Sequence, residues 1–240
     1  IVIEPDACVT VTSGCTEAIA AAMFGLLNPG DEVVMFEPFY DSYRACVAMA
    51  GAVPRVVTLR PDGRGGFGFD PAEFAAAFTG KTRAVLVNTP HNPTGKVFSR
   101  EELAIIASHA IEHDAIVFSD EVYDKLVYDP ARPHVSIATL DGMAERTVTL
   151  NSLGKSFSLT GWKVGWAIAP PALTAGVRAA HQFLTFATAT PLQHGAAAIL
   201  EEPRDSVART VELFVRNRNT LAACLRRVGF EVFDSPGTYF

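Results

Sequence analysis

Short apolar runs rich in Val, Ile and Thr alternate along the chain with longer runs in which apolar residues recur at helical spacing. The short runs predict strands at residues 8–12, 33–36, 55–59, 84–87, 115–118, 146–150 and 162–168. The longer runs between them predict helices at residues 18–27, 41–50, 71–79 and 100–113. Strands and helices that alternate in this way form a mainly parallel, doubly wound sheet with helices on both faces. The pattern therefore predicts an α/β fold up to residue 170.

From Pro171 onward the pattern is helical, and Gly229 ends the last and longest helical run. Helices are expected at residues 171–184, 190–200 and 204–228, followed by strands at residues 230–233 and 237–240. We interpret residues 1–203 as a large domain, 204–228 as a long connecting helix and 229–240 as the start of a smaller α+β domain. The glycine-rich stretch at residues 60–69 predicts a surface loop without regular structure.

Composition narrows the class of protein. The 240 residues are 49% hydrophobic, which is enough for a large core. A formal net charge of -6 argues against a nucleic-acid partner or an anionic membrane surface. The four scattered cysteines form no C-x-x-C pair, which fits a reducing cytoplasm and argues against a zinc site or a disulfide framework. The six histidines also show no metal-ligand spacing, so no metal is expected.

Polar residues follow the carboxyl ends of the predicted strands, where parallel sheets place their ligand crevice. The segment Ser13-Gly14-Cys15-Thr16 lies between the first strand and the first helix. This order aims the free N–H groups of the helix, and its positive dipole end, at the sheet edge, where they can bind an anion. Ordinary capping by Ser13 or Thr16 is the alternative. Cys15 is expected only to let the backbone come close.

Two further strand ends carry aromatic and amide groups. Phe39 and Tyr40 follow the second strand, either as core residues or with one of them flat against a planar ligand. Asn92 lies in a turn between two prolines, which either fixes its amide rigidly or simply forms a tight turn. Asn92-Pro93 and Glu37-Pro38 are the candidates for cis peptide bonds.

The last two strand ends carry a carboxylate and a lysine. Asp120 ends a strand, with Tyr123 expected on the same face, and a buried Asp120 needs a cationic or N–H partner to stay ionised. Lys155 lies between Ser152 and Lys163. A lone lysine in such a turn would be a solvated charge. A nucleophilic lysine must be desolvated or placed near other cations, and a turn at the mouth of an apolar sheet can provide this.

Together these groups suit one cofactor. A phosphate is bound by N–H groups and cations, a pyridine ring by a flat face and a carboxylate at its nitrogen, and an aldehyde by an amine. Pyridoxal 5'-phosphate carries all three groups. The strand ends therefore predict a pyridoxal-phosphate pocket.

Five motifs in sequence order now support a family resemblance: S-G-C-T-E-A, E-P-F-Y-D-S-Y, N-T-P-H-N-P-T-G, S-D-E-V-Y and S-L-G-K-S-F-S-L-T-G-W-K-V-G-W. Over essentially its whole length the chain resembles the class I/II aminotransferases of the fold type I pyridoxal-phosphate superfamily. It looks most similar to the branch with kynurenine, methionine and N-succinyldiaminopimelate aminotransferases and cysteine-conjugate β-lyases.

The resemblance implies a role for each matching residue. Lys155 matches the Schiff-base lysine and proton carrier, Asp120 the carboxylate on the ring nitrogen, and Tyr123 the third catalytic residue. Tyr123 and Asn92 match the donors to the ring hydroxyl oxygen, and Tyr40, or Phe39 as second choice, the aromatic that stacks on the ring. The backbone of Gly14, Cys15 and Thr16, with Ser152 and Lys163, matches the phosphate-binding group. Lys163 stands where many relatives carry arginine, so it keeps the charge without the bidentate fork.

The function that the resemblance implies is a ping-pong transfer of an amino group between an L-amino acid and a 2-oxo acid. A β-lyase would use the same residues and eliminate a β-substituent. An aminotransferase-like sensor domain of a transcription regulator is a further alternative. A nucleotide-binding protein is poorly supported, because no G-x-G-x-x-G or G-x-x-x-x-G-K-[ST] follows a strand.

The resemblance also implies parts outside this sequence and a partner subunit. The arginine for the substrate carboxylate is expected beyond Phe240 and a covering segment before Ile1, so this fragment alone is expected to be incomplete. A homodimer is expected, with the active site at its interface. Phe39 and Phe186 are the candidates for contact with the substrate side chain, and His91 is expected to be an exposed turn residue.

Overall fold

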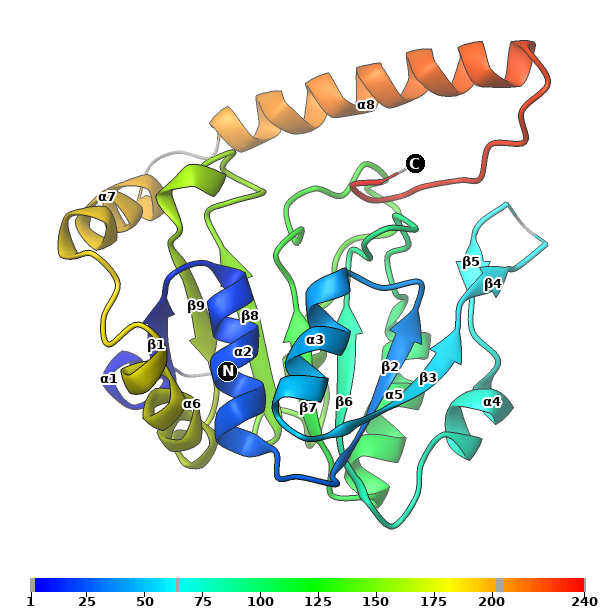
Figure 1. Ribbon diagram of the computed structural model, residues 1–240. Helices are drawn as coiled ribbons and strands as arrows, with labels where there is room; N and C mark the ends of the chain where they lie inside the picture. Colours follow the sequence, from blue (N-terminus) through cyan, green and yellow to red (C-terminus); the bar gives the residue numbers. More distant parts are fainter. Residues whose placement is uncertain (1–2, 64, 202–204, 240) are drawn as a thin grey trace.

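In a computed structural model, which describes residues 3–63, 65–201 and 205–239, a seven-stranded sheet runs through the molecule (Figure 1). Its strand order is β1 (Val9–Thr12), β9 (Gly165–Ile168), β8 (Thr147–Ser152), β7 (Ile116–Asp120), β6 (Thr82–Asn88), β2 (Glu32–Glu37) and β3 (Val53–Thr58). The five strands from β8 to β3 are parallel, and β9 is antiparallel to both β8 and β1. The predicted α/β fold with a mainly parallel sheet is confirmed.

Helices cover both faces of this sheet, as the apolar runs of its central strands require. On one face, α2 (Cys15–Leu26), α3 (Asp41–Met49) and α6 (Pro171–Leu184) enclose one hydrophobic core cluster. On the other face, α4 (Pro71–Ala76), α5 (Arg100–Glu112) and the short 3-10 helix η1 (Ile137–Thr139) enclose a second. The short α1 (Pro5–Cys8) precedes β1.

Most predicted strand ends lie within two residues of the observed ones, and two stretches differ more. The strand expected at residues 162–168 starts only at Gly165, because Thr160–Trp162 forms a 3-10 turn, η2. The loop expected at residues 60–69 contains a small antiparallel hairpin of β4 (Arg60–Pro61) and β5 (Phe67–Gly68). The Phe67 ring packs against the Phe233 ring at 5.1 Å, which gives this hairpin an apolar contact that its glycine content did not suggest.

The carboxyl-terminal part follows the predicted helices, α7 (Thr190–Glu201) and α8 (Asp205–Arg227), but not the predicted strands. Residue 204, the expected start of the last helix, and residue 240 lie outside the described residues. Residues 230–233 and 237–239 form no strand. They fold back instead, and the Gly237 N–H donates to the Gly95 carbonyl at 2.9 Å. The division into a large domain, a connecting helix and a smaller domain stays a prediction.

The carboxyl ends of the parallel strands point toward α8, which lies above that edge in Figure 1. This is the edge at which the polar strand-end residues were expected to meet. None of the described helices is both long and apolar enough to cross a membrane.

Candidate active site

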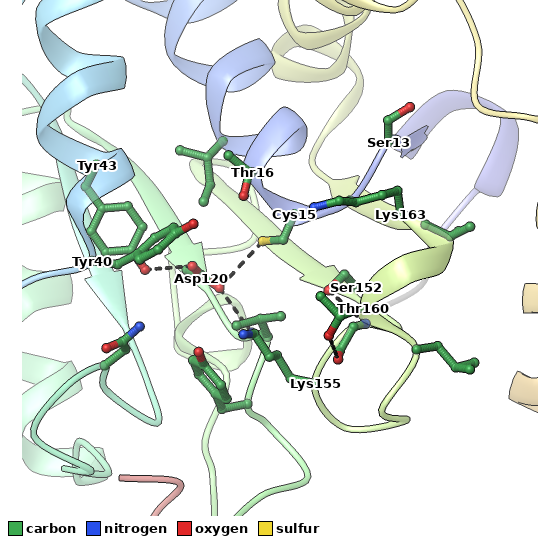
Figure 2. A pocket seen from close by; sticks show the side chains of 18 of the residues that line it. Ser13, Cys15, Thr16, Tyr40, Tyr43, Asp120, Ser152, Lys155, Thr160 and Lys163 are labelled. Atoms are coloured by element: carbon green, nitrogen blue, oxygen red, sulfur yellow. Dashed lines mark hydrogen bonds between the residues drawn. The ribbon is translucent and has the colours of Figure 1, made fainter.

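A cavity of about 210 Å³ lies at the carboxyl edge of the sheet. Its lining includes all ten residues that the sequence singled out: Gly14, Cys15, Thr16, Tyr40, Asn92, Asp120, Tyr123, Ser152, Lys155 and Lys163. Figure 2 shows the labelled side chains converging from the first turn of α2, the start of α3, the end of β7 and the loop after β8. The fold therefore brings together five motifs that are spread over about 150 residues of the sequence, from Gly14 to Lys163.

The first turn of α2 presents backbone N–H groups to this cavity. Gly14 is the N-cap residue, with φ +85°, and no side chain caps the helix. The Ser13 N–H donates instead to the Glu17 carboxylate at 2.9 Å, and Thr16 lies within the helix. Capping by Ser13 or Thr16, the alternative from the sequence, is therefore wrong. The N–H groups that begin a helix have no intrahelical partner, so these remain available to an anion.

Strand β9 supports this turn from behind. A Cβ atom on Gly165 would lie 2.6 Å from the carbonyl carbon of Gly14 and 2.7 Å from the Cys15 nitrogen, so only glycine allows the two backbones to come this close. Lys163, in the left-handed conformation at φ 52°, lays its side chain along Gly14, whose ideal Cβ position is 3.7 Å from the lysine Cδ. Figure 2 shows Lys163 reaching toward the α2 turn. The helix end thus gains a flexible positive charge.

We expect the substitution Gly165→Ala to weaken pyridoxal-phosphate binding by about tenfold or more, because displacement of a positioned binding group by about 1 Å has large effects. The added methyl group must push the Gly14–Cys15 backbone away. A titration of the apoprotein with the cofactor, followed by absorbance, measures the change. Gly80→Ala is the matched control, since nothing lies within 4 Å of a Cβ atom there. Equal affinities for both variants would contradict the supporting role of Gly165.

Asp120 lies at the end of β7 and is only 3% exposed. Its Oδ2 accepts a hydrogen bond from the Tyr43 hydroxyl at 2.6 Å, and its Oδ1 accepts from the Val122 N–H at 3.1 Å and from the Cys15 thiol at 3.7 Å. Burial raises the pKa of Asp120, while these three hydrogen bonds act in the opposite direction. The expected N–H partner is present. All three partners are neutral, so a protonated ring nitrogen would supply the cation that this carboxylate lacks.

Tyr43 is a member of the site that the sequence did not reveal. It is 1% exposed, and the Tyr40 ring meets its ring edge-on with centroids 5.6 Å apart. In the sequence it is one apolar position of a helix, which is typical of a core residue. Tyr43 lies three residues after Tyr40, on the same side of the first turn of α3, and this spacing could have indicated that it belongs to the site.

We expect the substitution Tyr43→Phe to move the acid limb of the pH profile of kcat/KM to higher pH. The hydroxyl lowers the pKa of Asp120, so its removal raises that pKa and leaves less carboxylate at a given pH. A hydrogen bond to a charged group is worth about 1.5–3 kcal/mol and one pKa unit about 1.4 kcal/mol, which predicts a shift of about one pH unit or more. An unchanged limb would show that Tyr43 only fills space.

Tyr123 and Asn92 also line the cavity. Tyr123 is 4% exposed, and its hydroxyl lies 2.8 Å from the Tyr239 hydroxyl. Burial raises the pKa of Tyr123, and the bond to Tyr239 adds to the effect. The Asn92 N–H donates to Asn88 Oδ1 at 2.7 Å, while Asn88 Nδ2 donates to the Asp120 carbonyl at 3.0 Å. Asn88 therefore connects the Asn92 turn to the end of β7 through these two hydrogen bonds. The sequence did not reveal this role of Asn88.

The turn geometry expected around the prolines is present. Asn92-Pro93 and Glu37-Pro38 are both cis, which confirms the two predictions. Thr89-Pro90 is also cis, and the sequence had not singled it out.

Lys155 comes from the loop after β8 and lines the cavity. Its Nζ lies 5.6 Å from the centroid of the Tyr123 ring. The side chain is exposed, so desolvation, the first of the two environments that suit a nucleophilic lysine, is not present. The Thr160 hydroxyl donates to the Gly154 carbonyl at 2.6 Å, and Ser152 Oγ accepts from the Gly154 N–H at 3.2 Å, which fixes the loop just before the lysine.

Three residues named in the sequence analysis do not line the cavity. His91 is 1% exposed instead of exposed, because its turn packs inward and its Nδ1 lies 2.9 Å from the Thr94 hydroxyl. Burial lowers the pKa of His91 to about 3. Phe39 packs against the core cluster under α2 and α3, which leaves Tyr40 as the aromatic at the cavity. Phe186 is 77% exposed.

Comparison with known proteins gives a consistent result. The family model for aminotransferase class I and II matches residues 1–240. A probable N-succinyldiaminopimelate aminotransferase of Mycobacterium tuberculosis is 51% identical over 237 residues, which cover 99% of this chain and 59% of the relative. A kynurenine–oxoglutarate transaminase of Dictyostelium discoideum is 39% identical over 248 residues, which cover 97% and 57%.

The solved structures agree with the sequence relatives. The structure of N-succinyldiaminopimelate aminotransferase from Mycobacterium tuberculosis superposes with a TM-score of 0.96 at 49% identity. The match covers 100% of this chain and 62% of that one. The chain thus spans about three fifths of the length of the proteins it matches.

Proposed function

Since the chain belongs to the class I and II aminotransferase family, we propose that the protein moves an amino group between an L-amino acid and a 2-oxo acid with bound pyridoxal phosphate. The observation that carries the proposal is one cavity that unites a helix start without a side-chain cap, a buried carboxylate with neutral partners, and a lysine amine.

The residues present fit pyridoxal phosphate. The N–H groups at the start of α2, with Lys163 and Ser152, would hold the phosphate, and the Tyr40 ring would face the pyridine ring. The ring nitrogen would pair with Asp120, and the ring oxygen would accept hydrogen bonds from Asn92 and Tyr123. Lys155 would hold the aldehyde carbon. When bound, the cofactor supplies an electron sink that stabilises negative charge at the substrate α-carbon.

Residues of the chain itself would hold and move the protons in this reaction. Asp120 is buried, and as a carboxylate it would keep a proton on the ring nitrogen; the Tyr43 hydroxyl holds this carboxyl group in place. Lys155 Nζ would accept the proton from the substrate α-carbon as a positioned base. Its side chain is exposed and unbranched, which leaves the amine free to reach that atom.

An isotope-transfer assay tests the proposal. The full-length protein, purified with pyridoxal phosphate, is incubated with 15N-labelled amino acids, including kynurenine and N-succinyldiaminopimelate, and with 2-oxoglutarate. We expect labelled glutamate to appear together with the 2-oxo acid of the donor. Release of pyruvate and ammonia from β-substituted amino acids, without labelled glutamate, would instead identify a β-lyase.

We also propose that two copies of the protein form a homodimer. The end of α6 and the turn after it expose Phe183 (87%), Leu184 (42%) and Phe186 (77%), an apolar patch of the kind that marks a protein interface. We expect the double substitution Phe183→Glu and Phe186→Glu to halve the mass found by sedimentation, with unchanged circular dichroism. A wild-type protein that sediments as a monomer would contradict the proposal.

The four cysteines Cys8, Cys15, Cys46 and Cys224 are all free, which supports a reducing cytoplasm as the proposed location. Retention of all four thiols in the protein isolated from its native cells, measured by alkylation, is the expected result. Disulfide-bonded cysteines in that material would contradict it.

A further inference from the structure

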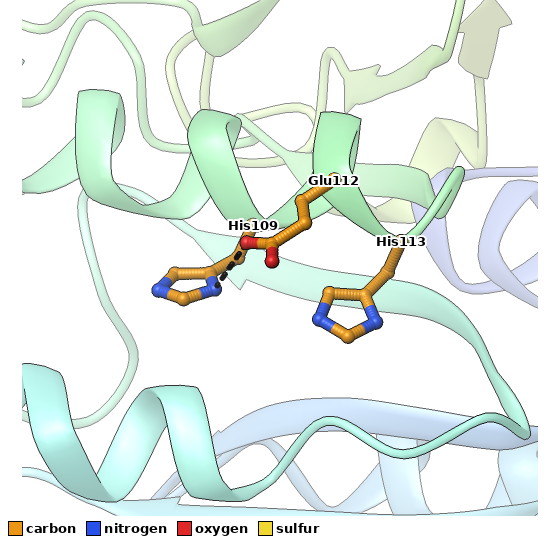
Figure 3. A group of neighbouring side chains, drawn as sticks. All are labelled: His109, Glu112 and His113. Atoms are coloured by element: carbon orange, nitrogen blue, oxygen red, sulfur yellow. Dashed lines mark ion pairs between the residues drawn. The ribbon is translucent and has the colours of Figure 1, made fainter.

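Three side chains of the ligand type gather at the carboxyl end of α5: His109, Glu112 and His113 (Figure 3). One possible ligand atom from each lies within 4.8 Å of the other two, and no other group of this kind occurs in the described part of the chain. The cluster precedes β7, whereas the candidate active site lies beyond the other end of that strand. The proposed transamination gives it no role.

Helix geometry places the three groups on one face. His109 and His113 are four residues apart and Glu112 is three from His109, the two spacings at which helical side chains are neighbours. The backbone N–H of His113 donates to the His109 carbonyl at 3.0 Å, so the helical hydrogen-bond pattern extends to His113. The histidines were not expected to show a metal-ligand spacing. His109 and His113, at positions i and i+4 of a helix, do show one.

The distances leave room for an ion. His109 Nδ1 lies 3.7 Å from Glu112 Oε2, which is too long for a hydrogen bond. Two ligands at about 2.0–2.2 Å from one zinc ion lie at most about 4.4 Å apart, so this separation is compatible with a shared ion. His109 Nδ1 is also buried and has no hydrogen-bond partner. A buried polar atom without a partner is uncommon and calls for an explanation.

The two imidazole rings are held by aromatic rings in α4 and just after its end. The Phe78 ring stacks on His109 at 5.3 Å and packs against His113 at 4.8 Å, and the Phe74 ring meets His109 edge-on at 5.5 Å. Rings held in this way lose little freedom when they bind an ion, which favours binding. The carboxyl end of a helix also carries partial negative charge, which attracts a cation.

We propose that His109, Glu112 and His113 bind one zinc ion. Two imidazoles and one carboxylate form a known zinc donor set, with water in the open position. Imidazole suits zinc better than it suits calcium or magnesium, which prefer oxygen ligands. Glu112, with 69% of its side chain exposed, leaves the site open to solvent, so the ion can enter without unfolding of α5.

Calorimetric titration with zinc chloride tests the proposal on the pyridoxal-phosphate-loaded protein, purified without a polyhistidine tag. We expect saturable binding of one ion per chain. Glu112→Gln and His113→Asn should each weaken this binding by at least about tenfold, since even changes around the ligands of a metal cost 10–100-fold in affinity. Glu112→Gln keeps the size of the side chain, His113→Asn replaces the ring with a smaller polar group, and circular dichroism verifies that both variants fold.

Matched controls remove the same residue types from other exposed helix positions. His194→Asn on α7 and Glu212→Gln on α8 should bind zinc as the wild type does. The proposal is overturned if the wild type shows no saturable binding up to millimolar zinc. It is equally overturned if Glu112→Gln and His113→Asn bind as the wild type does, since the ion then lies elsewhere. Neither result affects the proposed transamination, which uses none of these residues.

Discussion

Replacement of Lys155 by alanine is expected to lower kcat by at least about 10²–10⁴-fold, the contribution of a positioned acid–base group. The substitution also removes the amine that would hold the cofactor's aldehyde. Lys155 is exposed and lies on a loop, so its loss leaves no cavity in the core. Circular dichroism and thermal melting should therefore match the wild type. The amine-transfer assay, run beside these two, measures the loss.

Lys81→Ala is the matched control, because Lys81 is also an exposed lysine but lies before β6, at the opposite edge of the sheet. It should retain full activity. If Lys155→Ala unfolds, the lysine has a structural role instead. If the variant folds and keeps more than a tenth of the wild-type activity, Lys155 is not the base.

The second large effect is expected for Asp120→Asn, which preserves the shape of a buried side chain and removes its charge. The variant can no longer hold a proton on the ring nitrogen, so kcat should fall by about 10²–10³-fold, as for the loss of one preorganised electrostatic group. The Tyr43 hydroxyl can still donate to the amide oxygen, so the fold should persist. Steady-state kinetics with saturating cofactor give kcat.

Asp114→Asn controls for the change of residue type. Asp114 is exposed, pairs with Arg146 and has φ 48°, a conformation that asparagine also tolerates. Its activity should equal that of the wild type. An Asp120→Asn variant with activity within twofold of the wild type would mean that the carboxylate does not act on the cofactor.

The sheet and the position of the site were predictable because their signals are local. Each central strand is a short apolar run, and functional residues lie at or shortly after the ends of such runs, as Asp120 ends β7 and Lys155 comes three residues after β8. In a parallel sheet the ends of those runs must meet at one edge, so the linear order of motifs translated into a shared cavity.

Contacts between distant segments were not predictable. The Cys15 thiol reaches Asp120 from 105 residues away, and Tyr43 looks like an ordinary core position until its hydroxyl is seen on that carboxylate. Phe67 and Phe233 explain why a glycine-rich stretch forms a hairpin, and neither residue reveals the other in the sequence.

The orientation of side chains in turns was equally hidden. His91 was expected to be exposed because turns usually are, but its ring packs 6.3 Å from the Phe98 ring and becomes buried. For Lys155 the sequence left open whether the amine is desolvated or placed near another cation, and the structure exposes the side chain. Local pattern fixes where a turn occurs and not which way its side chains face.

The most direct test of the account is the visible absorption spectrum of the protein during titration with pyridoxal phosphate. The account predicts an absorption band from cofactor bound to a lysine amine, saturating at one cofactor per chain in the wild type and absent in Lys155→Ala. It also predicts that an amino-acid donor abolishes the band and that a 2-oxo acid restores it. A wild-type protein that develops no band, or a Lys155→Ala variant that develops the same band, would contradict the central claim.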